Sequence, residues 1–384
     1  MNTSIFISRR LRFKGGIAMG CIAISFLVMI IAVSVSSGFR SEVRSGLSVL
    51  SGDVQLTPPN MNVLDQSRPI EKEPAYLPYI YDVDGVSQVI PVVYMAGIVK
   101  QENDIYGVLF KGMPDGREGV SVPRALARKA GLEEGGKLTA YFVGDKVKVR
   151  QFEVTSLYDS MVETDDKMVI YADIVQLQRI SGWSDAQVSA IEIILDDDHK
   201  DEDSIYAASQ EIGYKVNAYS ADSEAPVIAT SSVSRFPQLF DWLDLIDFNV
   251  LFILVLMTIV AGFNMISGLL IMLFENISTI GLLKALGMTD RAISKVFLSS
   301  ASVLVLKGML IGNALAFAFC LIQDKTHVLK LDPSNYFVSY VPVKINVGSV
   351  LLADIGSFAV IMLLLLIPTL FISRVDPAQT VRMK

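Results

Sequence analysis

The chain has 384 residues, of which 52% are hydrophobic and 19% charged, and its mean hydropathy is +0.46. This composition excludes an intrinsically disordered chain, which has few apolar and many charged residues, and it is too apolar for an ordinary soluble protein. The two cysteines and two histidines lack the number and spacing of a disulfide scaffold or an ordinary zinc site. The formal charge of −7 argues against a nucleic-acid-binding protein.

Four long runs of apolar residues dominate the sequence. They predict transmembrane helices at 17–38, 241–275, 291–323 and 348–373, because about 20 apolar residues span the hydrocarbon core of a bilayer. The first run follows a basic segment, as a signal peptide does. Its apolar part is longer than the core of such a peptide and three more spans follow, so we interpret it as a retained anchor.

Lysine and arginine residues predict that both chain termini are cytoplasmic. In that orientation the cytoplasmic pieces are the N-terminus 1–16, the loop 276–290 and the C-terminus 374–384. Together with the residues that flank the loop, they hold ten basic and three acidic residues. An excess of positive charge on the cytoplasmic side is the rule for membrane proteins.

The residues between the first two spans form a separate exterior domain at 39–240, and a second exterior loop covers 324–347. The segment 38–247 carries 19 basic and 34 acidic residues, and it is long enough to be translocated whatever its charge. Its pattern predicts an α+β domain. The expected elements are strands at 53–57, 188–195 and 214–219, a hairpin at 141–149 with a two-residue Gly144-Asp145 turn, and a helix at 201–212 closed by Gly213.

The second and third spans are longer than a bilayer requires. Helical patterns run without a breaker from about Phe240 to Glu275 and from Thr289 to Gln323. Each would be roughly 50 Å long at 1.5 Å per residue, against a hydrocarbon core of about 30 Å. We interpret the helix of the second span as a rigid rod that projects into the exterior domain. The alternatives are a helix that is tilted in the membrane and a helix that begins only near Asn249.

The cytoplasmic loop is predicted to be a short helix. Ile277, Ile280, Leu283 and Leu286 recur at i+3 spacing. Gly287 is a suitable residue to end this helix, and Thr289 is a suitable N-cap for the next one. We expect that so short a loop does not bury its apolar stripe against its own chain. The stripe therefore predicts a cytoplasmic partner or packing against the lipid headgroups.

The sequence shows no catalytic centre, no metal site and no cofactor site. Residues 131–138 approach the phosphate-binding motif G-x-x-x-x-G-K-[ST], but Leu138 replaces the hydroxyl residue and a strand is expected where a helix should begin. The acidic run 196–203 lacks the spacing and the glycine of a calcium-binding loop. We interpret the first motif as a turn and the second as the start of a helix.

Two polar or small-residue features lie inside the predicted spans. Lys307 is an ionisable residue near the centre of the third span, where such residues are functional candidates; the alternatives are snorkelling to the headgroups or an interhelical hydrogen bond. Small residues occur at helical spacing at Gly16 and Gly20, and at Gly308, Gly312, Ala316 and Cys320. Because small residues allow helices to pack closely, we expect these positions to form packing faces within the chain or between protomers.

Several segments resemble the FtsX-like (MacB-type) ABC permeases, and among these the lipoprotein-releasing permeases LolC and LolE. The resemblance is carried by the stretches 261–270, 281–288, 336–343 and 374–378, together with Ser37-Gly38-Phe39 after the first span. It covers nearly the whole chain, is specific in the last 150 residues or so and is looser in the exterior domain.

The resemblance implies a multi-pass protein of the bacterial inner membrane with four transmembrane helices and a MacB-like periplasmic α+β domain between the first two. It implies a homologous second permease copy or a paralogue, and a cytoplasmic ABC ATPase dimer that binds ATP and Mg²⁺ in place of this chain. The implied function is mechanical release of acylated lipoproteins from the outer leaflet to a periplasmic carrier. The alternatives are a MacB-like efflux permease, an FtsX-like regulator of a cell-wall hydrolase, and a membrane-anchored sensor without an ATPase.

Two groups of residues are the candidate sites. The coupling helix against the ATPase is expected to use Ile277, Ile280, Gly281, Leu283, Lys284, Leu286, Gly287 and Met288. Acyl chains need an apolar surface that is open to the outer leaflet, and the outer halves of the first two spans offer one. The residues expected there are Val33, Phe39, Phe248, Leu251, Phe252 and Val255.

Overall fold

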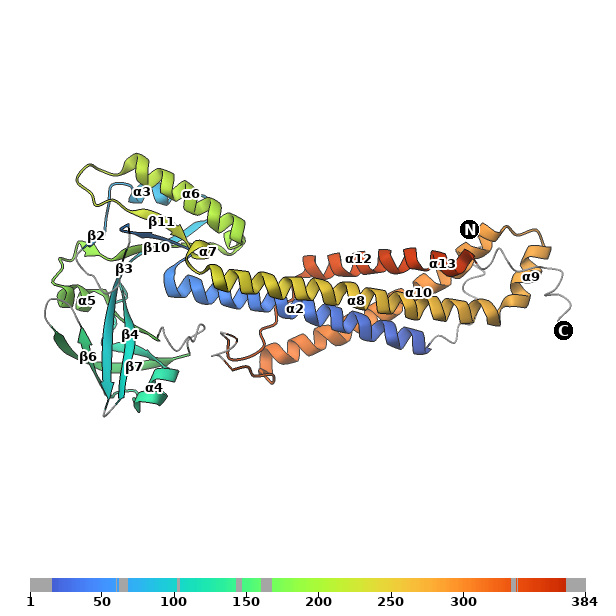
Figure 1. Ribbon diagram of the computed structural model, residues 1–384, viewed down its shortest axis with the longest axis horizontal. Helices are drawn as coiled ribbons and strands as arrows, with labels where there is room; N and C mark the ends of the chain where they lie inside the picture. The colour runs from blue at the N-terminus through green and yellow to red at the C-terminus, as the bar shows by residue number, and fades with distance from the viewer. Residues whose placement is uncertain are drawn as a thin grey trace. The chain divides into compact units, whose positions relative to one another are not determined.

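The computed structural model describes residues 16–59, 61, 68–101, 104–142, 147–159, 168–332, 336 and 338–370. Contacts divide the chain into two compact units (Figure 1). We call residues 1–40, 243–329 and 341–384 the helical unit, and residues 41–242 and 330–340 the β-rich unit. The predicted cytoplasmic termini, 1–16 and 374–384, lie outside the described residues except for Gly16.

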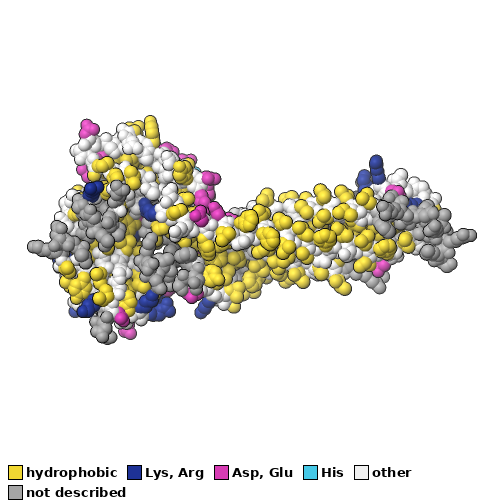
Figure 2. Space-filling view, in the orientation of Figure 1, with side chains coloured by type: hydrophobic (Ala, Val, Ile, Leu, Met, Phe, Trp, Pro, Cys, Tyr) yellow, Lys and Arg dark blue, Asp and Glu magenta, His cyan; other side chains and the backbone are white. Residues whose placement is uncertain are grey.

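Among the described residues, four helices are long and apolar enough to cross a membrane, which agrees with the predicted number of spans. Their hydrophobic side chains cover the visible face of the helical unit (Figure 2). A short helix, α9 (Ile277–Ala285), joins the second and third. The four are α2 (Gly16–Ser51), α8 (Pro237–Glu275), α10 (Asp290–Thr326), and α12 (Val347–Leu364), which α13 (Leu366–Thr369) continues.

Helix α2 continues to Ser51, well beyond the predicted end of the first span at residue 38. The charged residues after Phe39 end the apolar run but not the helix. Phe39, Val43 and Leu47 follow one another at i+4 spacing and are all buried, so one apolar stripe keeps the helix packed past its membrane part. The first strand of the β-rich unit therefore begins only after Gly52, whose φ of +68° ends the helix.

The small-residue face of α10 is a packing surface within the chain. A Cβ atom on Gly312 would lie 2.4 Å from the carbonyl oxygen of Ala23, and one on Gly308 would lie 2.7 Å from a side-chain carbon of Ile22. Ala316 and Cys320 are buried as well. Helices α2 and α10 therefore approach each other as closely as glycine allows. Among the described residues, nothing lies within 4 Å of the corresponding positions on Gly16 and Gly20.

The β-rich unit is built on a nine-stranded sheet in the order β11-β1-β10-β3-β4-β8-β5-β7-β6. An additional β3–β6 pairing closes the strands from β3 to β6 into a barrel. A separate pair joins β2 (Ile70–Glu71) and β9 (Gln187–Val188). The large sheet consists of β1 (Val54–Thr57), β3 (Val86–Gln101), β4 (Asp104–Met113), β5 (Val120–Pro123), β6 (Lys137–Phe142), β7 (Lys148–Tyr158), β8 (Met168–Asp173), β10 (Ala190–Leu195) and β11 (Ile228–Ser231).

Phe110, Phe142 and Phe152 pack together in the core of the barrel.

Short helices cover this sheet. Helix α6 packs against β11 and β1, and α3 lies beside it (Figure 1). The remaining elements are α3 (Leu77–Ile80), α4 (Arg124–Ala130), α5 (Ile174–Ser181), the 3₁₀ turn η1 (Asp197–His199), α6 (Glu202–Tyr219) and α7 (Ser232–Arg235).

Two of the predicted exterior elements are wrong in detail. Gly213 does not end a helix, and residues 214–219 are helical rather than a strand, because Ile212 and Val216 continue the buried stripe of α6. The strand that follows α6 is β11 instead: β10 and β11 both run antiparallel to β1 and are therefore parallel to each other.

The predicted hairpin is present as β6 and β7, with a different register. Tyr141 pairs with Val149, whereas a two-residue turn at Gly144-Asp145 would place Tyr141 opposite Lys148. The predicted strands at 53–57 and 188–195 are confirmed as β1 and as β9 with β10. The turn residues 143–146 themselves lie outside the described part of the chain.

The close approach of α10 to α2 generates a testable prediction. A Gly312→Leu substitution should destabilise the protein by about 1–3 kcal/mol, because the new side chain meets backbone and Phe26 rather than open space. Gly356→Leu is the matched control, since nothing lies within 4 Å of a Cβ atom at that position among the described residues. Thermal unfolding of the two purified variants in detergent tests this, and equal midpoints would contradict the packing.

Candidate functional site

The turn between the second and third spans has a defined geometry. Helix α9 ends in a Schellman motif: the amide of Gly287 donates to the carbonyl of Lys284 at 2.9 Å, and that of Met288 to the carbonyl of Leu283 at 3.0 Å. Gly287 has a φ of +85°. Thr289 caps α10 by accepting from the amide of Ala292. Both predicted caps are confirmed, and they fix the course of the chain on each side of the turn.

One face of α9 packs against the helical unit. Ile280 and Gly281 are buried, and Leu283 and Met288 pack against the same apolar cluster. Lys284 forms an ion pair with Asp290 at 2.9 Å. The expectation that the apolar stripe could not be buried by its own chain is therefore wrong for the middle of the stripe. Ile277, at its start, is half-buried.

The opposite face of α9 presents leucines to the surroundings. Leu286 is 75% exposed and Leu282 is 56% exposed. The prediction of a single apolar stripe with i+3 spacing is wrong for the ends of the helix. Each step of three residues falls about 60° short of a full helical turn. Over the three steps from Ile277 to Leu286 these differences add up to half a turn, so the two residues lie on opposite faces. Leu282 was missed for the same reason, although a strict 3.6-residue period would have placed it beside Leu286.

Charged residues tie α2 to α8 at one end of the helical unit. The guanidinium of Arg40 forms ion pairs with Asp244 at 2.8 Å and with Asp247 at 2.5 Å. The hydroxyl of Ser36 donates to Asp247. We call these four residues the Arg40 clamp. Two long helices are thereby joined near the places where the chain passes into the β-rich unit. The clamp was missed at the sequence level, because its members are about 200 residues apart.

The six residues predicted to line an acyl path divide into two groups. Phe248, Leu251, Phe252 and Val255 form an exposed stripe on α8, each with more than half of its surface accessible. Val33 and Phe39 on α2 are buried, so the prediction of an open apolar surface is wrong for these two. The segment after residue 340 covers α2 there: Pro342 lies directly against Gly38, and Lys344 donates its amide to the carbonyl of Ser34.

Lys307 does not face the interior of its own bundle. Its side chain is exposed on α10, next to the exposed Leu306 and Leu310, which leaves snorkelling or contact with another molecule. The polar residues that are buried between helices are others. Asn313 donates to Asp354 at 2.6 Å between α10 and α12.

The two loop motifs that were weighed as binding sites have structural roles. Gly131 takes a left-handed conformation that ends α4, and the amide of Gly136 donates to the carbonyl of Glu133 in the turn before β6. In the acidic run, Asp196 caps η1 and Asp201 caps α6. A turn and helix starts were the predicted interpretations, and both are confirmed.

Comparisons with known proteins identify the helical part. Residues 251–377 match the family described as the FtsX-like permease C-terminal domain. The lipoprotein-releasing system transmembrane protein LolC of Neisseria meningitidis serogroup B is 21% identical, over 95% of this chain and 93% of its own length. Residues 251–377 are therefore assigned as an FtsX-like permease domain. The four apolar helices of the described residues fit a membrane permease of this type.

Two solved structures are similar to about half of this chain. The extracellular domain of the transporter YknZ from Gram-positive bacteria is 14% identical and covers 46% of this chain and 99% of its own, with a TM-score of 0.30. The periplasmic region of MacB from Actinobacillus actinomycetemcomitans is 12% identical and covers 48% of this chain and 91% of its own, with a TM-score of 0.31.

The outward face of α9 generates the second prediction. Leu286→Glu should reduce the amount of ATPase that co-purifies with the permease at least tenfold, because a charge would enter an apolar contact where a central residue contributes about 2 kcal/mol or more. Thermal stability should stay unchanged, since Leu286 packs little against its own chain. Leu283→Glu is the contrasting variant, and it should lower stability because Leu283 packs against the buried cluster. A normal yield of ATPase with Leu286→Glu would exclude this face as the contact.

Proposed function

We propose that this permease releases acylated lipoproteins from the outer leaflet of the inner membrane to a soluble periplasmic carrier. The observation that carries the proposal is the similarity to a lipoprotein-releasing permease over 95% of the chain, which extends through both units rather than through the membrane helices alone. The exposed apolar stripe on α8 supports it, since acyl chains require such a surface.

The orientation follows from the basic residues of the predicted cytoplasmic pieces. Both termini and α9 face the cytoplasm in this proposal, and the β-rich unit faces the periplasm. The partners are a dimer of ABC ATPase subunits, which binds ATP and Mg²⁺, and a second copy of the permease or a paralogue. This chain contributes no catalytic residue to ATP hydrolysis.

Force enters at α9 and leaves through the two long helices. When the ATPase dimer closes on ATP, it moves the exposed leucines of α9. Packing of Ile280 and Leu283 passes that movement to the helical unit. Helix α8 runs unbroken through 39 residues and α2 through 36, and the Arg40 clamp makes them move together. The cargo is then expelled laterally, so its lipid does not cross the bilayer.

A break in α8 tests this route. Ile246→Pro should remove one backbone hydrogen bond and force a kink, at a cost of about 3 kcal/mol, and the kink would lie between the two acids of the Arg40 clamp. We expect ATP hydrolysis and complex assembly to persist and lipoprotein release to fall at least tenfold. The measurement is lipoprotein released per ATP hydrolysed in proteoliposomes that contain the permease and its ATPase. Ile246→Ala is the control, and full release by the proline variant would show that α8 is not the transmitting rod.

The acyl path is tested by photocrosslinking. A photoreactive amino acid at Leu251 or Phe252, both exposed on α8, should label the acyl chains of bound lipoprotein, and ATP should abolish the labelling. The same probe at Val33 should label neither cargo nor lipid, because that side chain is buried. Mass spectrometry of the adducts identifies the cargo. Exclusive labelling of phospholipid, or of a small amphiphilic compound, would contradict lipoprotein release and favour an efflux or regulatory role.

A further inference from the structure

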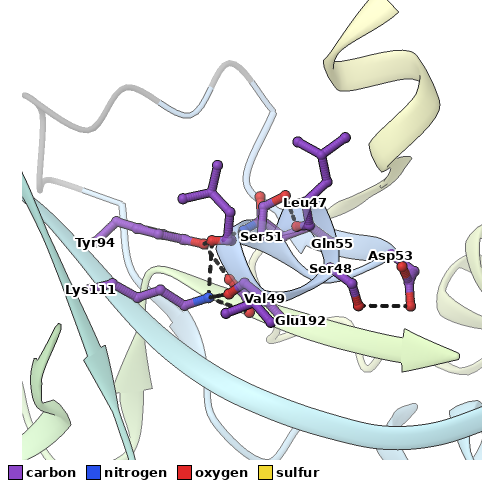
Figure 3. Close-up of polar contacts among 10 residues, drawn as sticks. Leu47, Ser48, Val49, Ser51, Asp53, Gln55, Tyr94, Lys111 and Glu192 are labelled. Atoms are coloured by element: carbon purple, nitrogen blue, oxygen red, sulfur yellow. Dashed lines mark hydrogen bonds and ion pairs between the residues drawn. The ribbon is translucent and has the colours of Figure 1, made fainter. Parts of the chain in front are cut away.

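The outer end of α2 is held by a buried lysine of the β-rich unit. Lys111, on β4, donates from Nζ to the carbonyl oxygens of Val49 and Leu50 in the last turn of α2, at 2.8 and 3.0 Å. Its third hydrogen bond goes to the carboxylate of Glu192 on β10, at 2.8 Å. Figure 3 shows the ammonium group between the helix end and the strands. The last carbonyls of a helix have no partner within it, so a cation there satisfies both charge and hydrogen bonding.

A second layer of contacts keeps this arrangement closed. The hydroxyl of Tyr94 contacts the carboxylate of Glu192, lies 3.3 Å from the carbonyl oxygen of Leu50, and accepts a hydrogen bond from Gln55 at 3.1 Å. The side chains of Lys111 and Glu192 are essentially inaccessible to water. Burial raises the pKa of Glu192 and lowers that of Lys111, and their ion pair opposes both shifts. A buried pair of this kind is costly to break on one side only.

Asp53 fixes the same helix end from the other direction. Its carboxylate accepts hydrogen bonds from the hydroxyl of Ser48 on α2, at 3.1 Å, and from the amide of Leu195 on β10, at 2.9 Å. Its own amide donates to the carbonyl of Ile193, and its carbonyl accepts from the amide of Ser232. Ser232 begins α7, which directly precedes α8. The end of α2, strand β10 and the lead-in to α8 therefore meet at Asp53.

We propose that Lys111 and Glu192 lock the outer end of α2 onto strands β4 and β10, and that this lock delivers the movement of α2 to the β-rich unit during transport. The proposal rests on the proposed function for its transport readout. Both residues are positioning residues, because they act on the helix and not on cargo or ATP. If the last turn of α2 unwound to absorb a movement, Lys111 would lose two of its three acceptors in a place that water does not reach.

A paired substitution tests the lock without leaving the Lys111 ammonium or the Glu192 carboxylate buried without the other. The double variant Lys111→Met with Glu192→Gln removes the ammonium group and the carboxylate together. We expect normal assembly and ATP hydrolysis, and at least a tenfold loss of lipoprotein released per ATP. The matched control is Lys215→Met with Glu211→Gln, a pair within α6 in which Glu211 is exposed and Lys215 is half-buried, and it should leave this ratio unchanged. A parental ratio in the Lys111/Glu192 variant would overturn the proposal.

Hydrogen exchange of the parental complex gives an independent readout that needs neither a variant nor a cargo. The amides of Gly52 and Asp53 donate to the carbonyls of Ser48 and Ile193, so they report whether the helix end stays closed. We expect equal protection in the nucleotide-free and the ATP-trapped complex. Loss of protection in either state would show that the end of α2 opens, and would overturn the lock. If the parental complex released no lipoprotein, the proposed function would be refuted. The hydrogen exchange of Gly52 and Asp53 would still test the lock, because it does not depend on the cargo.

Discussion

The structure depends on helices that stay intact beyond the membrane. Within the hydrocarbon core every backbone group must find its partner inside the helix, so a span cannot bend freely there. Helices α2 and α8 extend this rigidity past the core, with 36 and 39 residues, or about 54 and 58 Å at 1.5 Å per residue. The Arg40 clamp and the contacts of Lys111 and Asp53 can transmit a movement only because the helices that they hold do not bend.

Local sequence was sufficient where a single segment determines its own structure. The four spans were predictable from their apolar runs, and the two caps of the turn from Gly287 and Thr289, because a cap depends on its own conformation and on neighbours within one turn. The extension of α2 was not predicted, because Arg40 and Arg44 interrupt the apolar run while the buried stripe continues beneath them. The β3–β6 pairing could not be predicted from the sequence, because it joins strands about 40 residues apart and leaves no local pattern.

The candidate sites were predicted less well than the fold, because exposure depends on what other segments cover. Val33 and Phe39 are as apolar as Phe248 and Phe252, and no local pattern separates the two pairs. A segment about 300 residues later in the chain packs against Gly38 and Ser34, beside the first pair. Lys111 was equally hidden, because a lone lysine in a strand gives no sign that the end of a distant helix supplies its acceptors.

Polar contacts inside the membrane limit how the helices of one chain can move against one another. Thr258 on α8 and Ser357 on α12 share a hydrogen bond of 2.9 Å, and both hydroxyls also contact the sulfur of Met29 on α2. Asn313 and Asp354 join α10 to α12. Sliding α8 by one helical turn would break the first junction in a medium that offers no water to replace it. We therefore infer that the four helices move as one body, so that the movement proposed above for transport carries all four together.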